Sequence, residues 1–390
     1  MNKTAPWPCF TDTEIAAVTA VLKSGKVNYW TGEQGRLFEK EFAQYVGCDH
    51  GIAVANGTVA LDLALVAIGV GAGDEVIVTS RTFIASISAI VNAGATPVFA
   101  DVDLDSQNIT PITIKPLITG KTRAIICVHL AGWPCDMPDI MALAAEYKLK
   151  VIEDCAQAHG AKIGEQYLGS FGDIAAFSFC QDKIMSTGGE GGMVVTSNKP
   201  YWQAMWAYKD HGKSWPAVYE QEHPPGFRWL HEGFGTNWRL TEMQSAIGRY
   251  QLTQLEDWIN RRQMLADHIY QVCRQYEWLR IPDIPATLKH AHYKAYVFII
   301  PERLPKGMTR EKLMLDLNQS GVFCMSGSCS EVYLEKAFDQ CTFKPEKRLE
   351  NAKILGETSL MFQVHPTITD ADIGAIQVVL KEVFDRVGNP

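Results

Sequence analysis

The chain has 390 residues, of which 47% are hydrophobic and 21% are charged, a balance typical of globular proteins with one large or two smaller domains. Its formal net charge of −8 argues against a general nucleic-acid binder, which would carry a basic surface. No apolar run reaches membrane-spanning length, the N-terminus lacks the apolar core of a signal peptide, and the ten scattered cysteines form no C-x-x-C motif. We therefore expect a cytoplasmic protein with no membrane or nucleic-acid partner and no metal site.

Short apolar segments alternate with helical patterns over the first half of the chain. Strands are predicted at residues 51–55, 75–80, 96–103, 123–130 and 150–155, and helices at 58–70, 83–94 and 137–149. Val- and Ile-rich strands that alternate with helices indicate parallel strands buried on both faces. The sequence therefore predicts a doubly wound α/β sheet, whose ligands bind beyond the carboxyl ends of the strands.

The pattern changes near residue 240, where a long helix with few breakers is predicted over residues 240–276. A smaller α+β unit follows, with a strand predicted at 295–300 and helices at 309–321, 346–359 and 369–384. We place the boundary after residue 250. This gives a large α/β domain over residues 1–250 and a small C-terminal α+β domain over residues 251–390.

Candidate ligand-binding residues follow the first two predicted strands. Gly57 and Thr58 enter a helix directly after the first strand, and the free N–H groups and dipole at such a helix end suit a phosphate. An ordinary loop and helix cap would have the same sequence. Phe83 follows the second strand, where it is expected to stack on a flat ring or, alternatively, to lie in the core.

Two acids and a lysine follow the later strands. Glu153 and Asp154 end a strand whose first residues should be buried, and buried acids need partners. Asp154 is therefore expected either in a structural ion pair or opposite a protonated heterocyclic nitrogen. Lys183 lies between the apolar segment AFSF and the glycine-rich loop GGEGG. Desolvation among apolar groups favours a neutral amine, which is a nucleophile for carbonyl carbon.

These parts match the requirements of pyridoxal 5′-phosphate (PLP). This cofactor brings a phosphate, a flat ring, a ring nitrogen that pairs with an acid, and an aldehyde that forms a Schiff base with a lysine. The sheet offers a phosphate site (Gly57 and Thr58), a stacking ring (Phe83), an acid (Asp154) and an amine (Lys183). The whole set in strand order predicts a PLP-dependent enzyme.

The chain also resembles a known family, the DegT/StrS-like PLP-dependent nucleotide-sugar aminotransferases. The resembling segments occur in the same order over nearly the whole chain and are NGTVALDLAL, TSRTFIAS, PVFADVD, VHLAGWPCDM, VIEDCAQAHGA, GSFGDIAAFSFCQDK, GGEGGMV and NWRLTEMQSAIG. The resemblance implies fold type I, with a mostly parallel doubly wound sheet in the large PLP-binding domain and a smaller C-terminal α+β domain.

The resemblance assigns roles around the cofactor ring. Lys183 corresponds to the lysine that forms the Schiff base and moves the proton, and Asp154 to the partner of the pyridine nitrogen. Phe83 corresponds to the stacking aromatic, and Gln157 to a residue packed by the ring and its hydroxyl.

The resemblance also assigns contacts to the phosphate. Gly57, Thr58 and Ser178 match phosphate contacts within the chain. Asn237 matches a residue that the family offers to the phosphate from the neighbouring subunit. The resemblance therefore implies a homodimer with its active site at the subunit interface.

The implied reaction moves an amino group from L-glutamate to a nucleotide-linked keto sugar, with pyridoxamine phosphate as the intermediate form of the cofactor. A 4-keto-6-deoxy sugar is favoured and a 3-keto sugar is the alternative, in amino-sugar and surface-polysaccharide biosynthesis such as that of lipopolysaccharide O-antigen. One group of the family replaces the lysine by histidine and dehydrates sugars, so Lys183 favours transamination. A PLP-dependent sugar dehydratase or lyase is the first alternative.

An NAD-dependent dehydrogenase is the second alternative, although no G-x-G-x-x-G motif follows the first strand. The sugar itself is not predicted, because the segment FCMSGSCSEVYLEKAF departs from the tyrosine- or histidine-rich substrate loop of the family. Four residues are candidates either for the sugar pocket or for structural positions: His129, Trp133, His292 and Tyr333.

Overall fold

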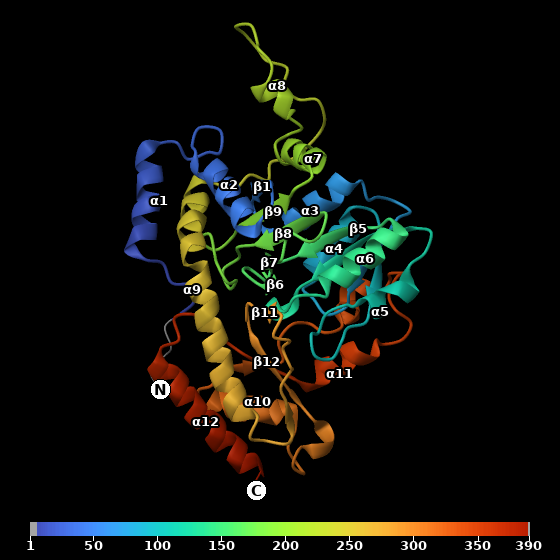
Figure 1. The fold of residues 1–390 in the computed structure, drawn as a ribbon, viewed down its shortest axis with the longest axis vertical. Coiled ribbons are helices and arrows are strands. Elements are labelled where there is room, and N and C mark those ends of the chain that lie inside the picture. Colours follow the sequence, from blue (N-terminus) through green and yellow to red (C-terminus); the bar gives the residue numbers. More distant parts are fainter. Residues whose placement is uncertain (1–5, 389–390) are drawn as a thin grey trace.

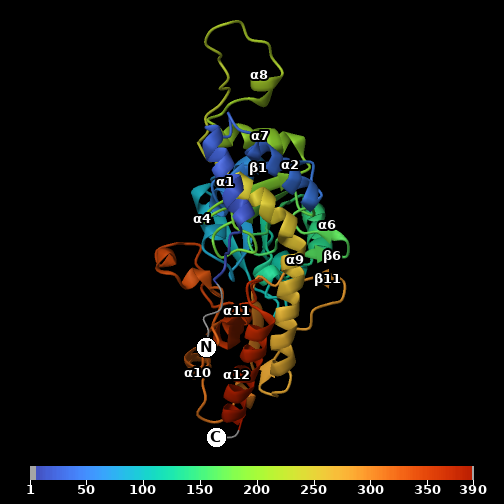
Figure 2. The same cartoon turned by 90° about the vertical axis from the view of Figure 1, so that its left-hand side faces the viewer.

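The computed structural model describes residues 6–388 and has a large sheet in one half and a smaller sheet in the other (Figures 1 and 2). The seven strands of the large sheet follow the order β1 (His50–Val54), β9 (Gly192–Thr196), β8 (Ile174–Ser178), β5 (Lys150–Asp154), β4 (Thr122–Val128), β2 (Glu75–Thr79), β3 (Thr96–Ala100). Strand β9 is antiparallel to both of its neighbours, and the other strands run in one direction. The predicted mostly parallel sheet is therefore confirmed.

The strands of the large sheet send alternate side chains into two separate cores. In β2, Ile77 packs in one core with Phe38 and Phe42, whereas Val76 and Val78 pack in the other. Successive residues of a strand face opposite sides of the sheet, so Val- and Ile-rich strands are buried on both faces.

Helices cover both faces of this sheet, as a doubly wound fold requires. The first core is covered by α2 (Gln34–Val46), α6 (Met137–Tyr147) and α9 (Glu242–Cys273), and the second by α3 (Gly57–Ile68), α4 (Ala85–Asn92) and α7 (Lys199–Lys209). The other helices before α9 are α1 (Asp12–Ser24), α5 (Pro111–Ile114) and α8 (Trp215–Tyr219).

The C-terminal half is built on an antiparallel sheet with the order β10 (Leu279–Arg280), β12 (Ala295–Ile299), β14 (Ser359–Phe362), β13 (Cys324–Met325). Its helices are α10 (Arg310–Gln319), α11 (Glu350–Thr358) and α12 (Asp370–Gly388). A third sheet has the order β11 (Leu288–Lys289), β6 (Lys162–Ile163), β7 (Gln166–Tyr167). Because β11 of the C-terminal half pairs with β6, this sheet joins the two halves.

Helix α9 runs from the large sheet into the C-terminal half, as Figure 1 shows. Leu255 and Ile259 pack in the core beneath the large sheet, and Leu265 and Ile269 pack in the core of the C-terminal half. The predicted domain boundary after residue 250 falls inside this helix and stays a prediction. Within residues 6–388, no helix is both long and apolar enough to cross a membrane.

A substitution at Gly248 would test how closely α9 packs against α2. A Cβ at this position would lie 2.5 Å from Cζ of the buried Phe38 ring. Gly248→Ala gains about 1 kcal/mol of helix propensity, but overpacking a core ring costs about 1–3 kcal/mol. We expect the variant to unfold at a lower urea concentration than the native protein.

Gly374 of α12 is the matched control, because no atom lies within 4 Å of the position of its Cβ. Gly374→Ala should raise the free energy of unfolding by about 0.5–1 kcal/mol. A rise in stability of both variants would contradict the close contact between α9 and α2.

Candidate active site

The carboxyl ends of β1, β2, β5 and β8 lie along one edge of the large sheet, because these strands run in the same direction. The segments that leave this edge carry Gly57, Phe83, Asp154 and Lys183. Residues that are far apart in the sequence therefore meet at the place where a doubly wound sheet binds its ligands.

Asp154 is the buried acid at this edge, with an exposed fraction of 5%. Its Oδ2 accepts a hydrogen bond of 2.8 Å from Ser86 Oγ, and its Oδ1 accepts one of 3.1 Å from the Ala156 N–H. Burial raises the pKa of the Asp154 carboxyl, although these hydrogen bonds and the charge of Lys183 oppose the rise. No lysine, arginine or histidine among residues 6–388 forms an ion pair with Asp154, so the structural ion pair considered from the sequence is wrong.

Lys183 is half-buried in the loop after β8. Its N–H donates to the carbonyl oxygen of Cys180 at 3.0 Å, and its carbonyl oxygen accepts a hydrogen bond of 2.7 Å from the indole N–H of Trp7. Its Nζ lies 5.0 Å from the centroid of the Tyr293 ring. The amine thus lies beside an aromatic ring and is partly exposed to solvent.

Two positions in the glycine-rich loop after Lys183 have no room for a side chain, because other atoms lie close to the backbone there. Gly191 has φ of +159°, and a Cβ there would lie 2.0 Å from Oγ1 of Thr187. A Cβ on Gly192 would lie 2.4 Å from the carbonyl oxygen of Asn56. These glycines therefore let β9 approach the start of α3, next to the predicted phosphate site.

The start of α3 carries the predicted phosphate contacts. The Asn56 side chain caps the helix by accepting a hydrogen bond of 3.0 Å from the Val59 N–H. The N–H groups of Gly57 and Thr58 belong to the first turn, where the helix provides no acceptor. A Cβ on Gly57 would lie 2.6 Å from Cβ of Ser178, so the structure brings these three predicted contacts to one place.

The remaining predicted residues lie around this edge. Phe83 precedes α4 and is 69% exposed, so the alternative of a core aromatic is wrong. Gln157 is buried, and its Oε1 accepts a hydrogen bond of 2.8 Å from the Ala131 N–H. Asn237 is exposed and forms a β-bridge with Asp210, at the base of a segment that projects from the molecule.

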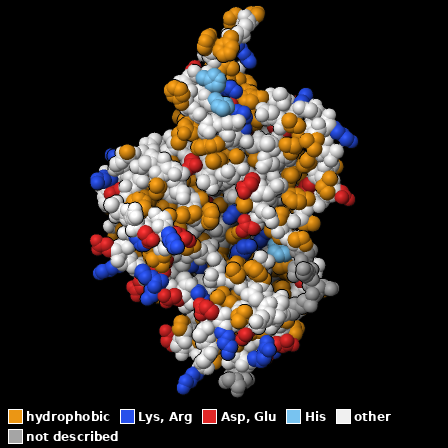
Figure 3. Space-filling view, turned by 180° about the vertical axis from the view of Figure 1, so that it is seen from behind, with side chains coloured by type: hydrophobic (Ala, Val, Ile, Leu, Met, Phe, Trp, Pro, Cys, Tyr) orange, Lys and Arg blue, Asp and Glu red, His pale blue; other side chains and the backbone are white. Residues whose placement is uncertain are grey.

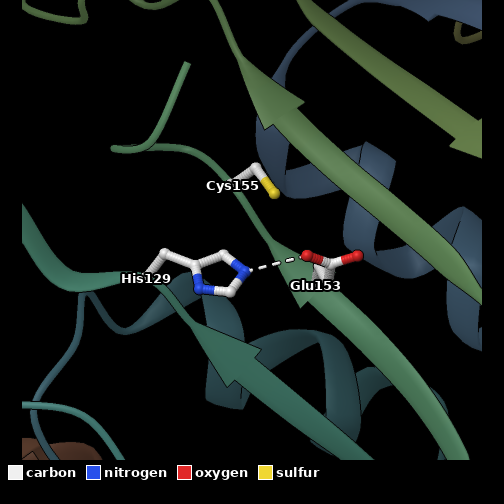
Figure 4. Close-up of side chains that lie close together, drawn as sticks. All are labelled: His129, Glu153 and Cys155. Atoms are coloured by element: carbon white, nitrogen blue, oxygen red, sulfur yellow. Dashed lines mark hydrogen bonds and ion pairs between the residues drawn. The ribbon is translucent and has the colours of Figure 1, made fainter. Parts of the chain in front are cut away.

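Glu153 points away from this edge into the core, where it lies near His129 and Cys155 (Figure 4). The Cys135 N–H donates to Nδ1 of His129, so the other ring nitrogen carries the proton and donates to Glu153 Oε2 at 3.1 Å. Three backbone N–H groups also donate to the Glu153 carboxylate, those of Gly169, Phe171 and Gly172. Because both carboxylate oxygens of Glu153 and both ring nitrogens of His129 already take part in hydrogen bonds, these two side chains hold the core together in this arrangement.

The four residues that were candidates either for the sugar pocket or for structural positions are all buried within the chain. Their exposed fractions are 0% for His129, 5% for Trp133, 0% for His292 and 1% for Tyr333. Conversely, the sequence analysis missed Ser86, Tyr293 and Trp7. Their contacts join segments that are remote in sequence, and no local pattern signals them.

The residues at this edge fit PLP. A buried carboxylate without a cationic partner suits a protonated pyridine nitrogen, and the uncapped N–H groups at the start of α3 suit a phosphate. Lys183 follows β8, which lies between β1 and β5 in the order of the sheet, and its charge interacts with that of Asp154. The fold and the site together define an aminotransferase of PLP fold type I.

Comparison with known proteins specifies the family. The model of the DegT/DnrJ/EryC1/StrS aminotransferase family matches residues 8–381, and the chain belongs to this family. The chain is thus an aminotransferase with PLP as its cofactor and pyridoxamine phosphate as the aminated form.

Similar proteins include a GDP-perosamine synthase of Escherichia coli O157:H7, which is 44% identical over 67% of this chain and 68% of its own length. A UDP-N-acetyl-3-dehydro-alpha-D-glucosamine 3-aminotransferase of Acidithiobacillus ferrooxidans is 36% identical over 90% of this chain and 89% of its own. The crystal structure of an aminotransferase from Psychrobacter cryohalolentis has 55% identity and a TM-score of 0.98, and the match covers 99% of this chain and 100% of that one.

The hydrogen bonds to the buried Glu153 carboxylate give a prediction about stability. Glu153→Gln places an amide N–H₂ opposite backbone donors, which should lower the free energy of unfolding by about 2 kcal/mol. Glu165→Gln is the matched control, because Glu165 is exposed in the turn between β6 and β7. Urea denaturation should separate the two variants. EDTA and zinc should leave the melting temperature of the native protein unchanged, and a zinc-dependent rise would contradict the structural assignment.

Proposed function

We propose that this aminotransferase moves an amino group from L-glutamate to a nucleotide-linked keto sugar, with a 4-keto-6-deoxy sugar favoured over a 3-keto sugar. The observation that carries the proposal is the position of buried Asp154 and half-buried Lys183 at one edge of the sheet. The names of the two curated relatives, one GDP-linked and one UDP-linked, support a nucleotide sugar as the acceptor. Surface-polysaccharide biosynthesis, such as that of O-antigen, is the proposed pathway.

In this proposal Asp154 and Lys183 do different work. When bound, PLP supplies an electron sink for negative charge that develops on the substrate carbon. The Asp154 carboxylate would face the ring nitrogen and keep it protonated, while Ser86 and Ala156 hold the carboxylate in position. The Lys183 amine would move a proton from the α-carbon of the donor to C4′ of the cofactor, and from C4′ to the acceptor carbon in the second half-reaction, a general acid–base role.

The other predicted residues bind the cofactor in this proposal. Gly57, Thr58 and Ser178 contact the phosphate, where the start of α3 adds N–H groups and the positive end of the helix dipole. Phe83 has the exposed ring that stacking requires, and Gln157 packs by the cofactor ring and its hydroxyl.

The direct test is incubation of the purified enzyme with L-glutamate and a panel of nucleotide-linked keto sugars, followed by mass spectrometry. We expect an amino sugar and 2-oxoglutarate in equal amounts. A product that has lost water and gained no nitrogen would favour the alternative of a PLP-dependent sugar dehydratase or lyase. The alternative of an NAD-dependent dehydrogenase is wrong, because the chain belongs to an aminotransferase family.

Lys183→Ala should abolish the lysine-linked absorbance band of the cofactor and lower turnover by about 10²–10⁴-fold, since it removes the amine that moves the proton. Asp154→Asn should lower turnover by about 10²-fold or more, because it removes the charge that stabilises the protonated ring. Lys121→Ala and Asp139→Asn, at exposed positions, should leave both properties unchanged. Full turnover of Lys183→Ala would contradict the proposed role.

We also propose a homodimer in which each subunit completes the active site of the other. Residues 210–236, the arm, project from the large domain at the top of Figures 1 and 2. Hydrophobic side chains gather on the arm in Figure 3, and Phe227, Trp229 and Phe234 are 79%, 85% and 101% exposed. Apolar side chains exposed to this degree are typical of protein interfaces. Asn237 follows the arm and would reach the phosphate of the partner subunit.

A variant that carries both Trp229→Asp and Phe234→Asp should be monomeric by light scattering and inactive, because charged side chains oppose burial of the arm. Ile112→Asp is the control, since Ile112 is 84% exposed outside the arm and should tolerate the change. A double variant that stays dimeric, or a monomer with full activity, would contradict the proposal.

We propose a cytoplasmic location because the cysteines form no disulfide bonds. All ten are free thiols, although several lie buried near one another in the core. Free thiols in this number favour a reducing compartment.

A further inference from the structure

A group of cations surrounds the Tyr293 ring beside Lys183. The Nζ atoms of Lys183 and Lys294 lie 5.0 Å and 4.6 Å from the centroid of this ring. The Tyr293 hydroxyl donates a hydrogen bond to Asp182, the residue before Lys183. Lys294 and Lys183 therefore contact the same aromatic ring, and the charge of Lys183 acts on Lys294.

Arg262 of α9 adds a third positive charge that lacks a counter-ion. It is 1% exposed, and its Nη1 makes long contacts of 3.3 Å and 3.5 Å with the carbonyl oxygens of Tyr293 and Val364. Its Nε and Nη2 have no hydrogen-bond partner in the described part of the chain. The guanidinium lies against the Trp7 ring, with Cζ 5.2 Å from the ring centroid.

The positive charges of this group exceed the negative ones. Burial lowers the pKa of Lys294 to about 8 and that of Arg262 to about 9, and the charge of Asp182 opposes both shifts. Burial alone would raise the pKa of Asp182, but Lys183 and the Tyr293 hydrogen bond lower it overall, which keeps it ionised. The exposed carboxylate of Asp182 acts on Lys183, Lys294 and Arg262, of which Arg262 is the buried one, and a buried charge without a close partner is costly. His159, His292 and His365 pack nearby with lowered pKa values, so they add no charge at neutral pH.

We propose that Lys294, with Arg262 behind it, binds a carboxylate of the amino donor beside Lys183. This inference rests on the proposed function and assigns the donor to a place within the same site. The carboxylate supplies the negative charge that the group lacks, and Lys294 donates a charge-assisted hydrogen bond to it. The Trp7 ring lies against Arg262, and the Tyr293 ring lies within 5.0 Å of the Nζ atoms of both Lys183 and Lys294.

The position of Lys294 favours the donor over the diphosphate of a nucleotide sugar. In an amino acid the reacting carbon carries a carboxylate directly, so an anion site must lie close to Lys183. In a nucleotide sugar, the hexose ring separates the diphosphate from the keto carbon, which places that anion farther away.

Glutarate is a suitable probe, because it has two carboxylates and no amino group to transfer. Its affinity for the holoenzyme should be measured by calorimetry in the native protein and in Lys294→Met, Lys294→Arg and Lys312→Met. Loss of a charge-assisted hydrogen bond should weaken binding about tenfold or more in Lys294→Met. Lys294→Arg should keep most of the affinity. Lys312 is exposed on α10, so Lys312→Met is the matched control and should bind like the native protein.

The two half-reactions separate this inference from the proposed function. Lys294→Met should raise the KM for L-glutamate about tenfold and leave the affinity for UDP and GDP unchanged. Equal glutarate binding in Lys294→Met and the native protein would overturn the inference while transamination stands. Weakened UDP or GDP binding with unchanged glutarate binding would also overturn it, since the anion would then be a diphosphate. A native enzyme that aminates no keto sugar from glutamate would instead overturn the proposed function.

Discussion

The burial of Asp154 at the end of a parallel strand is the constraint on which the active site depends. A carboxylate out of water must be satisfied by donors, and among residues 6–388 these are the Ser86 hydroxyl and the Ala156 N–H. A carboxylate can accept about four hydrogen bonds, so Asp154 keeps acceptor capacity toward the edge of the sheet. This spare capacity, on a carboxylate that forms no ion pair with the described lysines and arginines, is what a protonated ring nitrogen needs.

Glu153, one residue earlier, is also a buried carboxylate, but the chain itself supplies all of its hydrogen-bond donors. Its side chain points to the other face of the sheet, because successive residues of a strand alternate. There it accepts hydrogen bonds from His129 and from three backbone N–H groups, which leaves no capacity for a ligand. Two adjacent acids therefore have different roles, and the number of donors around each decides which one is structural.

The junction between the two halves of the chain determines the surroundings of Lys183. Trp7 comes from the N-terminal segment, Arg262 from α9 and Tyr293 from the segment before β12, and all three meet at the loop after β8. The long helix α9 makes this meeting possible, since it packs in the core of the large sheet and in that of the C-terminal half. Charged side chains from several segments meet at this junction, because no single segment provides all of their hydrogen-bond partners.

Local patterns predicted strands β1 to β5 of the large sheet to within about three residues, because runs of Val and Ile need only their own neighbours to be recognised, but gave no bounds for β8 and β9. They did not reveal the antiparallel direction of β9, the helices α1 and α2, or the short strands of the third sheet. These features depend on pairing and packing between distant segments. The exposure of Phe83 and the burial of Trp133 likewise follow from what packs over them, which hydropathy alone does not specify.

By itself, the sequence determined the class of fold, the family and the positions of Lys183 and Asp154, since strand order places the residues that follow parallel strands at one edge. Only the tertiary structure decided which of the two acids is free to face a ligand, and that Lys294 and Arg262 meet around Tyr293, with two guanidinium nitrogens of Arg262 lacking a hydrogen-bond partner among residues 6–388. The physical reason is that hydrogen-bond satisfaction and charge balance are summed over all neighbours in space, and most of those neighbours are remote in the chain.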